Sequence, residues 1–343
     1  MLSVVLLLAA PALHAQWSDV ADDDEQSAWL EQQAAATEAY HARIAAAMAT
    51  SKDVREQAFA EVLRRPAAMP GNPVPGSDAP SRPVPRDAAA EARLRALATR
   101  AGDDRLANQL LIAAIADPAS RVRIEAARRW QAAEAGNATP LFHAALSPDA
   151  LLVEARRTTF ARTHMYEVVR WMSSAYLRHP LSSTELAALS GGEAYDAEEA
   201  ATMAAMALWA GGATPAHHRL VDACRGNSLR ATPTRAADCR HLATLLVEES
   251  DSVLDRMVGL SMLRELAGDN AERAAIDAQR RTMDWQMLQW GRIAQQQPRD
   301  GAEQFVRLLR DESIQGERQL AERVLQEAGV PLTPPAGWSP PRY

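Results

Sequence analysis

The chain has 343 residues and a formal net charge of −7, and only 5% of its residues are aromatic. Its basic residues are interleaved with Asp and Glu instead of forming a basic stripe, so the charge pattern argues against nucleic acid as a partner. Ala, Leu, Arg, Gln and Glu dominate, and period-two runs of β-branched residues are nearly absent. The composition therefore predicts an all-α fold.

Residues 1–15, MLSVVLLLAAPALHA, match the design of a secretory signal peptide, with cleavage expected after Ala15. The apolar run over residues 2–13 is too short to span a bilayer, and no later stretch reaches that length. A cleaved leader predicts a periplasmic or secreted protein without a membrane span. No Lys or Arg precedes the apolar run, and Leu13 is a poor residue before a cleavage site, so a buried N-terminal helix stays an alternative.

Residues 16–65 form the next expected unit, an N-terminal segment of two helices. Thr50 or Ser51 is expected to cap the second helix, with Asp53 in its first turn. Seven prolines then fall within residues 66–87, and this density predicts an extended linker rather than a helix.

Residues 88–330 read as a series of short amphipathic helices, followed by a proline-rich, extended tail over residues 331–343. Predicted helix starts are marked by a capping residue before a proline or by a capping box. The starts are Asp117-Pro118, Ser147-Pro148, Thr214-Pro215 and the pair Ser182 and Glu185. Glycines such as Gly102 fall where helices should end. Successive short helix pairs predict an α-solenoid-like array.

Two stretches carry a resemblance to helical-repeat families. DPASRVRIEAARRW, residues 117–130, resembles a helix of HEAT-type repeats, and residues 133–162 are similar to the helix–turn–helix unit of tetratricopeptide-type repeats. The Trp, Leu-Gly and Tyr positions of the tetratricopeptide pattern are missing, and no clean internal period is present. The resemblance implies an α-solenoid and, through it, protein binding.

The two cysteines, Cys224 and Cys239, are the only ones in the chain. Each occupies the apolar stripe of an expected helix, one over residues 215–225 and one over 236–249, in the series His217, Leu220, Val221, Cys224 and Cys239, Leu242, Leu246. Two antiparallel helices packed through these stripes would bring the sulfurs together. In an oxidising compartment the spacing predicts a structural disulfide that pins a long polar loop.

Two other chemistries compete for these cysteines. A zinc ion would use ligands from His217, His218, Cys224, Cys239 and His241, but the spacing lacks a C-x₂-C pair. A redox-active pair would be expected as C-x-x-C at a helix start, which is also missing. The structural disulfide is therefore the preferred interpretation.

Catalytic signatures are missing from the sequence: no nucleotide loop, nucleophile elbow or zinc-protease motif occurs, and no cofactor is expected. An all-α envelope hydrolase or lyase could act through a single acidic residue in a groove. Glu185, Glu248 and Glu249 are candidates for that role, although solvated helix faces and caps explain them equally well.

MDWQMLQW, residues 283–290, is the densest aromatic and methionine stretch. Met283, Met287 and Trp290 share one helical face, while Trp285 lies elsewhere on the helix. Core packing is the preferred interpretation, and contact of Trp285, Met287 and Trp290 with a partner is the alternative. The sequence thus predicts a non-catalytic exported protein that binds a protein or envelope component through a groove. A small-molecule or lipid carrier is a further alternative, which requires an enclosed apolar cavity.

Overall fold

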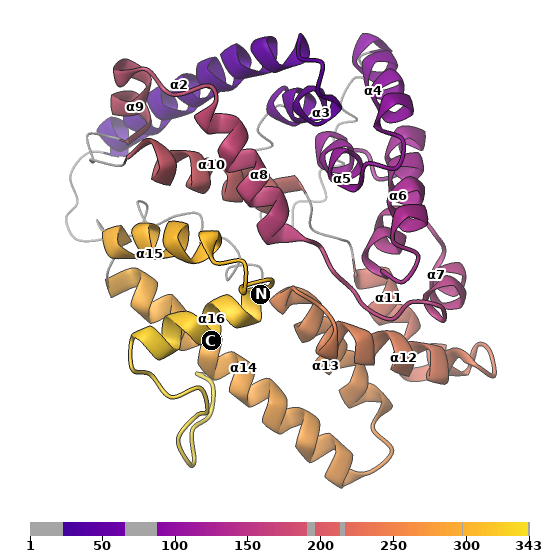
Figure 1. Cartoon of the computed structure of the whole chain (residues 1–343). Coiled ribbons are helices and arrows are strands. Elements are labelled where there is room, and N and C mark those ends of the chain that lie inside the picture. The colour runs from indigo at the N-terminus through magenta and orange to yellow at the C-terminus, as the bar shows by residue number, and fades with distance from the viewer. Residues whose placement is uncertain (1–22, 66–87, 191–195, 213–216, 297, 342–343) are drawn as a thin grey trace.

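The computed structural model describes residues 23–65, 88–190, 196–212, 217–296 and 298–341. These residues form fifteen α-helices and two short 3₁₀ helices, and the described part contains no β-strand beyond two isolated bridges (Figure 1). The predicted all-α class is confirmed. The expected leader over residues 1–15 and linker over 66–87 lie outside the described residues.

The first five helices form one end of the molecule. They are α2 (Asp23–Ala49), α3 (Val54–Leu63), α4 (Ala88–Ala101), α5 (Arg105–Ala114) and α6 (Arg121–Ala133). Helix α3 packs against α2, α4 and α5. Buried side chains of α2 and α3, such as Ile44 and Phe59, belong to the same hydrophobic cluster as those of α5 and α6. The N-terminal segment before the linker is therefore packed on the helices that follow it.

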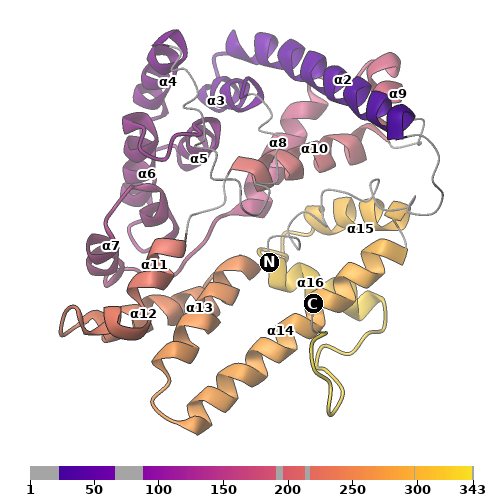
Figure 2. The ribbon, with the colours of Figure 1, turned by 180° about the vertical axis from the view of Figure 1, so that it is seen from behind.

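The middle of the chain returns to this end. It comprises η1 (Thr139–His143), α7 (Pro148–Ala155), α8 (Met165–Leu177), α9 (Ser183–Ser190) and α10 (Ala197–Gly212). Helices α8 and α10 pack against each other, and the apolar face predicted for α8 is buried, with Val169 and Tyr176 no more than 1% exposed. Helix α9 lies on α2 (Figures 1 and 2).

The last third of the chain begins with the elements around the two cysteines and ends with the proline-rich tail. Its elements are α11 (His218–Ala223), η2 (Gly226–Arg230), α12 (Arg235–Glu248), α13 (Val253–Leu266), α14 (Asn270–Gln296), α15 (Pro298–Arg310) and α16 (Glu317–Glu327). Helix α15 contacts both α8 and α10, as both views show (Figures 1 and 2). The C-terminal helices therefore lie against the middle of the chain.

The solenoid arrangement is not confirmed. In a solenoid each unit contacts its sequence neighbours. Here α2 contacts α9, and α10 contacts both α5 and α15. Residues 133–162, which resemble a tetratricopeptide unit, contain the 3₁₀ turn η1 and the single α-helix α7. Contacts between distant segments give the molecule its shape.

Two predicted helix starts are confirmed, and two are wrong. Ser147 accepts a hydrogen bond from Ala150 N–H at 3.3 Å, with Pro148 in the first turn. Ser182 and Glu185 form a reciprocal capping box, with N···O distances of 2.8 and 3.2 Å. Asp117-Pro118 forms a turn instead of a helix start, because its carboxylate accepts from Ala119 N–H at 2.9 Å and α6 begins only at Arg121.

The second error concerns the start of α3. Asp53 itself is the N-cap, since its carboxylate accepts a hydrogen bond from Arg55 N–H at 2.9 Å. Ser51 instead accepts a hydrogen bond from the Asp53 N–H at 3.1 Å. The predicted caps Thr50 and Ser51 therefore lie before the N-cap position, and Asp53 occupies that position instead of the first turn. Either serine or aspartate suits an N-cap, so residue preference alone could not choose between them.

The contact between α12 and α13 requires a glycine. A Cβ added at Gly259 of α13 would lie 2.7 Å from the Ala243 carbonyl oxygen and 2.8 Å from Val247 Cγ2. By contrast, a Cβ added at Gly291 of α14 would meet no atom within 4 Å.

We therefore expect Gly259→Ala to destabilise the fold by about 1–3 kcal/mol through overpacking. Gly291→Ala is the matched control, and it should stabilise the fold by about 0.5–1 kcal/mol because alanine favours a helix interior. Urea unfolding of both variants measures the difference. Equal effects of the two substitutions would contradict the close packing of α12 against α13.

Candidate functional site

Helix α14 presents the aromatic and methionine stretch on two faces. Met283 and Trp290 are 3% and 6% exposed and belong to two hydrophobic clusters. Met287 is partly buried and packs against both clusters. Met283, Met287 and Trp290 therefore share the inner face, as the spacing predicted, and Met287 and Trp290 are explained by contacts within the chain.

Trp285 lies on another face of α14, where the C-terminal tail covers it. The indole N–H of Trp285 donates a hydrogen bond to the Pro331 carbonyl oxygen at 2.8 Å. Its neighbour Gln286 donates from Nε2 to the Leu332 carbonyl oxygen at 3.0 Å. The ring of Trp338 meets the Trp285 ring edge-on, with centroids 5.4 Å apart. Two adjacent side chains thus hold two successive main-chain carbonyls and one aromatic ring.

The tail starts from a fixed point and then turns. Helix α16 packs against α14 and ends at Glu327. Gly329 follows with φ +68°, and Val330 N–H donates to the Leu325 carbonyl oxygen at 2.8 Å. Farther along, Trp338 N–H donates to the Pro335 carbonyl oxygen at 3.1 Å, closing a turn around Gly337. Residues 331–341 contain no helix. The turn brings the Trp338 ring back to Trp285.

Of the three residues considered for partner contact, only Trp285 meets a segment outside the compact core. Sequence reasoning missed Gln286 and Trp338. The sequence did contain a signal for the contact between the tail and α14. The proline-rich tail carries a single tryptophan, and α14 carries an indole that lies off its apolar face.

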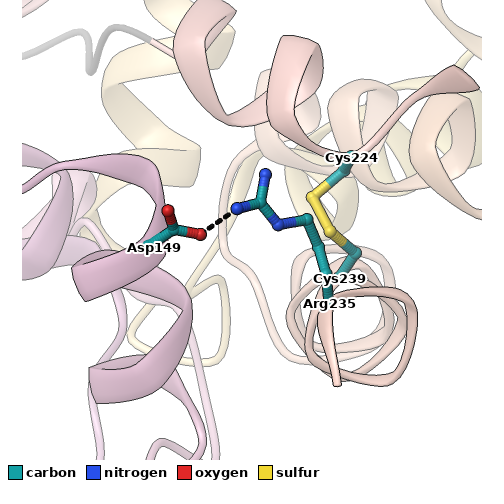
Figure 3. Close-up of a disulfide and its surroundings, with 4 residues drawn as sticks. All are labelled: Asp149, Cys224, Arg235 and Cys239. Atoms are coloured by element: carbon teal, nitrogen blue, oxygen red, sulfur yellow. Dashed lines mark hydrogen bonds and ion pairs between the residues drawn. A yellow bond between two sulfur atoms is a disulfide. The ribbon is translucent and has the colours of Figure 1, made fainter. Parts of the chain in front are cut away.

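The cysteine pair lies in a second hydrophobic cluster. Cys224 and Cys239 are fully buried and joined as a disulfide, with Cα atoms 5.7 Å apart (Figure 3). Leu242 and Leu246 of α12 are fully buried beside them, as the predicted stripe requires. Helix α11 is shorter than expected and has His217 as its N-cap, while the expected start at Thr214-Pro215 lies outside the described residues.

Ion pairs join this hairpin to α7. Arg235 is 7% exposed and pairs with Asp149 on the first turn of α7 (Figure 3). On the same interface Arg156 binds both carboxylate oxygens of Asp238 at 2.7 Å. A bidentate arginine–carboxylate pair fixes orientation as well as distance.

The histidines near the cysteines have other partners. His217 Nε2 lies 3.0 Å from Asp255 Oδ1, although the angle is not that of a hydrogen bond. His241 Nε2 is 3.1 Å from the Ala155 carbonyl oxygen. Among the described residues, no three His, Cys, Asp or Glu side chains are placed to hold a metal ion. The two sulfurs are bonded to each other, so the structure does not bring the five candidate zinc ligands together as one site.

The disulfide closes a loop whose ends are 15 residues apart. Replacing both cysteines with serine should lower the free energy of unfolding by about 3 kcal/mol, since the loop then gains freedom in the unfolded chain. We also expect faster tryptic cleavage after Arg230, which is exposed in the loop. Unchanged thermal stability and unchanged cleavage would contradict the structural role.

Three carboxylates, those of Asp251, Asp255 and Glu317, lie close to the N-terminal ends of helices α8 and α13. Asp251 accepts hydrogen bonds from Thr163 N–H and His164 N–H, both at 2.7 Å. Glu317 accepts from Val253 N–H at 2.6 Å, at the start of α13. Asp255, 1% exposed, accepts from the Ser250 hydroxyl at 2.9 Å. Negative side chains are stabilising at the positive ends of helices.

His164, at the start of α8, is held in an unusual conformation. Its φ is +54°, in the left-handed region that few residues other than glycine adopt. Its ring lies 3.0 Å from Glu134 Oε2, and the backbone is bound to Asp251. Although burial raises it, hydrogen bonds from His164, Asn137 and Trp130 bring the pKa of Glu134 down to about 2. Opposed carboxylates thus fix His164 from two sides.

Burial raises the pKa of Glu317 to about 7, and the negative charges of Asp251 and Asp255 raise it further. Burial also raises the pKa of Asp251, because both groups favour the neutral form when water is removed. The Tyr166 hydroxyl, near both carboxylates, has no hydrogen-bond partner among the described residues. These groups hold helix ends together, and sequence reasoning did not single them out.

Glu317 should make stability depend on pH. Its folded pKa of about 7 lies above the ordinary value of 4.5, so the contribution of Glu317 to stability is fully present below pH 4.5 and is lost as the pH rises through 7. Because water reaches part of the side chain, we expect a loss of about 2 kcal/mol. Glu317→Gln should remove much of this loss. Urea midpoints at pH 5 and pH 8 measure it.

Glu312→Gln, on the exposed side of the turn before α16, is the control and should leave the pH dependence unchanged. A wild-type chain equally stable at both pH values, or one whose pH dependence survives Glu317→Gln, would contradict this assignment.

The acidic residues considered for catalysis have ordinary surroundings. Glu185 belongs to the capping box, and Arg43 binds its two oxygens at 3.0 and 2.9 Å. Glu248 and Glu249 are exposed at the C-terminal end of α12. In Glu185 the hydrogen bonds from Arg43 and Ser182 lower the pKa to about 2, which favours the ionised form. A lowered pKa is the opposite of what a general acid needs, so Glu185 is not suited to that role.

Comparison with known proteins adds no relative, because no protein-family model, no curated protein and no solved structure matches the chain. No helix within the described ranges has both the length and the apolar character needed to cross a bilayer.

Proposed function

We propose that this chain is a non-catalytic exported protein that binds an extended, proline-rich segment of a protein partner on the Trp285 face of α14. The observation that supports this proposal is the chain's own tail, which occupies that face. Trp285 and Gln286 hold the tail through the carbonyl oxygens of Pro331 and Leu332.

The contacts have the chemistry of proline-rich recognition. A polyproline-type segment has no internal hydrogen bonds, so its carbonyls are free acceptors, and its restricted backbone loses little entropy on binding. An indole N–H and a side-chain amide are suitable donors, and the edge-on ring of Trp338 adds an apolar anchor. Because two of the contacts go to main-chain oxygens, segments other than the tail can satisfy them.

The surface favours this form of binding over an apolar groove. Among the described residues, the large apolar side chains with high exposure are Val153 and Leu177, at 44% and 40%. They belong to α7 and α8, and no tail contact involves them. A partner is therefore expected to bind through hydrogen bonds and one aromatic contact.

Export is part of the same proposal. The leader-like residues 1–15 indicate secretion, and a buried disulfide is typical of proteins in oxidising compartments. A periplasmic or secreted location would place the Trp285 face where envelope proteins with proline-rich segments can reach it.

The test is binding of a labelled peptide with the sequence of residues 331–343 to the full chain. In the wild type the attached tail competes at a high effective concentration, so the peptide should bind weakly. Trp338→Ala in the chain loosens the tail and should strengthen peptide binding by roughly 10-fold or more. Fluorescence anisotropy measures the affinity.

Adding Trp285→Ala or Gln286→Leu to the Trp338→Ala chain should abolish this gain. Adding Arg281→Ala, an exposed residue of the same helix, should preserve it. A peptide that carries Trp338→Ala itself should bind more weakly. If the Trp338→Ala chain binds the peptide no better than the wild type, the proposal is wrong.

A further inference from the structure

The contacts between the tail and α14 differ in how much sequence information they carry. Two of them are hydrogen bonds from Trp285 and Gln286 to main-chain carbonyl oxygens of the tail. Every residue has such a carbonyl, so these bonds hold an extended segment without reading its sequence. The third contact is made by a side chain, because the Trp338 ring meets the Trp285 ring edge-on. A choice among proline-rich segments must therefore depend on how the side chains of the segment are presented.

A tight turn places the Trp338 ring. The Trp338 N–H donates to the Pro335 carbonyl oxygen at 3.1 Å, which closes a four-residue turn over residues 335–338. Gly337, the third residue of this turn, has φ +77°, whereas Ala336 before it has no positive φ. A positive φ at the third position alone is typical of a type II turn, and glycine adopts it without strain. The turn thus fixes where the indole lies relative to the extended part of the tail.

Glycine is required in this turn by the backbone and not by a lack of space. Gly337 is exposed, and a Cβ added there would meet no atom within 4 Å. An L-residue in the left-handed region is nevertheless unfavourable, because its Cβ crowds its own backbone. A substitution at Gly337 therefore acts on the turn, and through it on the position of Trp338, without removing a contact with α14.

The extended part of the tail adds a preference of its own. Leu332 and Pro334 are partly buried. Thr333, which lies between them, and Pro335 are exposed. Partly buried positions thus alternate with exposed ones, as in an extended chain with one side toward the protein. A segment that binds as the tail does would carry apolar residues at these two partly buried positions, ahead of the turn.

We infer that the Trp285 face selects partner segments that contain a glycine–tryptophan turn, in the pattern Leu-x-Pro-x-x-Gly-Trp that residues 332–338 carry. This inference rests on the proposed function, since it names the class of partner for the same face. The prolines favour the extended approach, the carbonyls hold the segment, and the turn brings the indole to the Trp285 ring. A proline-rich segment without the turn would keep the two hydrogen bonds and lose the aromatic contact.

The probe is the labelled peptide of residues 331–343, added to the full chain that carries Trp338→Ala. A peptide with Gly337→Ala should bind roughly 10-fold more weakly than the unchanged peptide, because its turn places an L-residue in the left-handed region. A peptide with D-alanine in place of Gly337 contains the same atoms, but a D-residue favours a positive φ. It should bind at least as tightly as the unchanged peptide. Fluorescence anisotropy measures the three affinities.

Thr333→Ala in the peptide is the matched control. Thr333 is exposed and lies outside the turn, and its substitution also leaves a single methyl as the side chain. The affinity should stay within about 2-fold of that of the unchanged peptide, as is usual for an exposed position.

Two results would overturn the inference and leave the proposed function standing, because the unchanged peptide still binds in both. The Gly337→Ala peptide could bind as tightly as the unchanged one, which would mean that the face does not select the turn. The D-alanine peptide could bind as weakly as the Gly337→Ala peptide, which would mean that the methyl group, and not the backbone conformation, weakens binding. If no peptide binds the Trp338→Ala chain, the proposed function fails and this inference fails with it.

Discussion

The carboxylate of Asp251 ties together parts of the chain that lie far apart in the sequence. It accepts the backbone N–H groups of Thr163 and His164 at the start of α8, while the Asp251 carbonyl accepts from Glu317 N–H at 2.9 Å. At Gly316 a Cβ would lie 2.9 Å from that carbonyl oxygen, so only glycine permits the approach. Through this junction α16 is fixed beside α13, and the start of the tail is placed on α14.

The proposed binding face follows from this arrangement. The tail reaches Trp285 because α16 ends beside α14. One set of helix-end contacts thus positions the face of α14 that holds the chain's own tail.

Local features were predictable from the sequence because their causes are local. The capping box at Ser182 and Glu185, the Ser147-Pro148 start and the buried face of α8 each depend on residues within two turns of one another. The cysteine pairing was also predictable, since both stripes point into one hairpin and 15 residues separate the cysteines. Asp117 shows the limit: its side chain bonds to its own turn, which competes with a helix start.

The arrangement of the helices and the polar groups of the sites were not predictable in this way. Glu317 and Val253 meet across 64 positions, and Gln286 and Leu332 across 46, with no periodic signal to link them. The repeat resemblance suggested contacts between neighbours, whereas helices from the two ends of the chain meet α10.

The most direct test of the account is ¹⁹F spectroscopy of the full chain labelled with 5-fluorotryptophan, in which the Trp338 signal is followed as unlabelled peptide of residues 331–343 is added. The account predicts that the Trp338 signal moves from its position against Trp285 to that of a free tail, because the peptide takes its place on α14. A Trp338 signal that stays unchanged at saturating peptide would contradict it, and would mean that the tail is a permanent part of the fold.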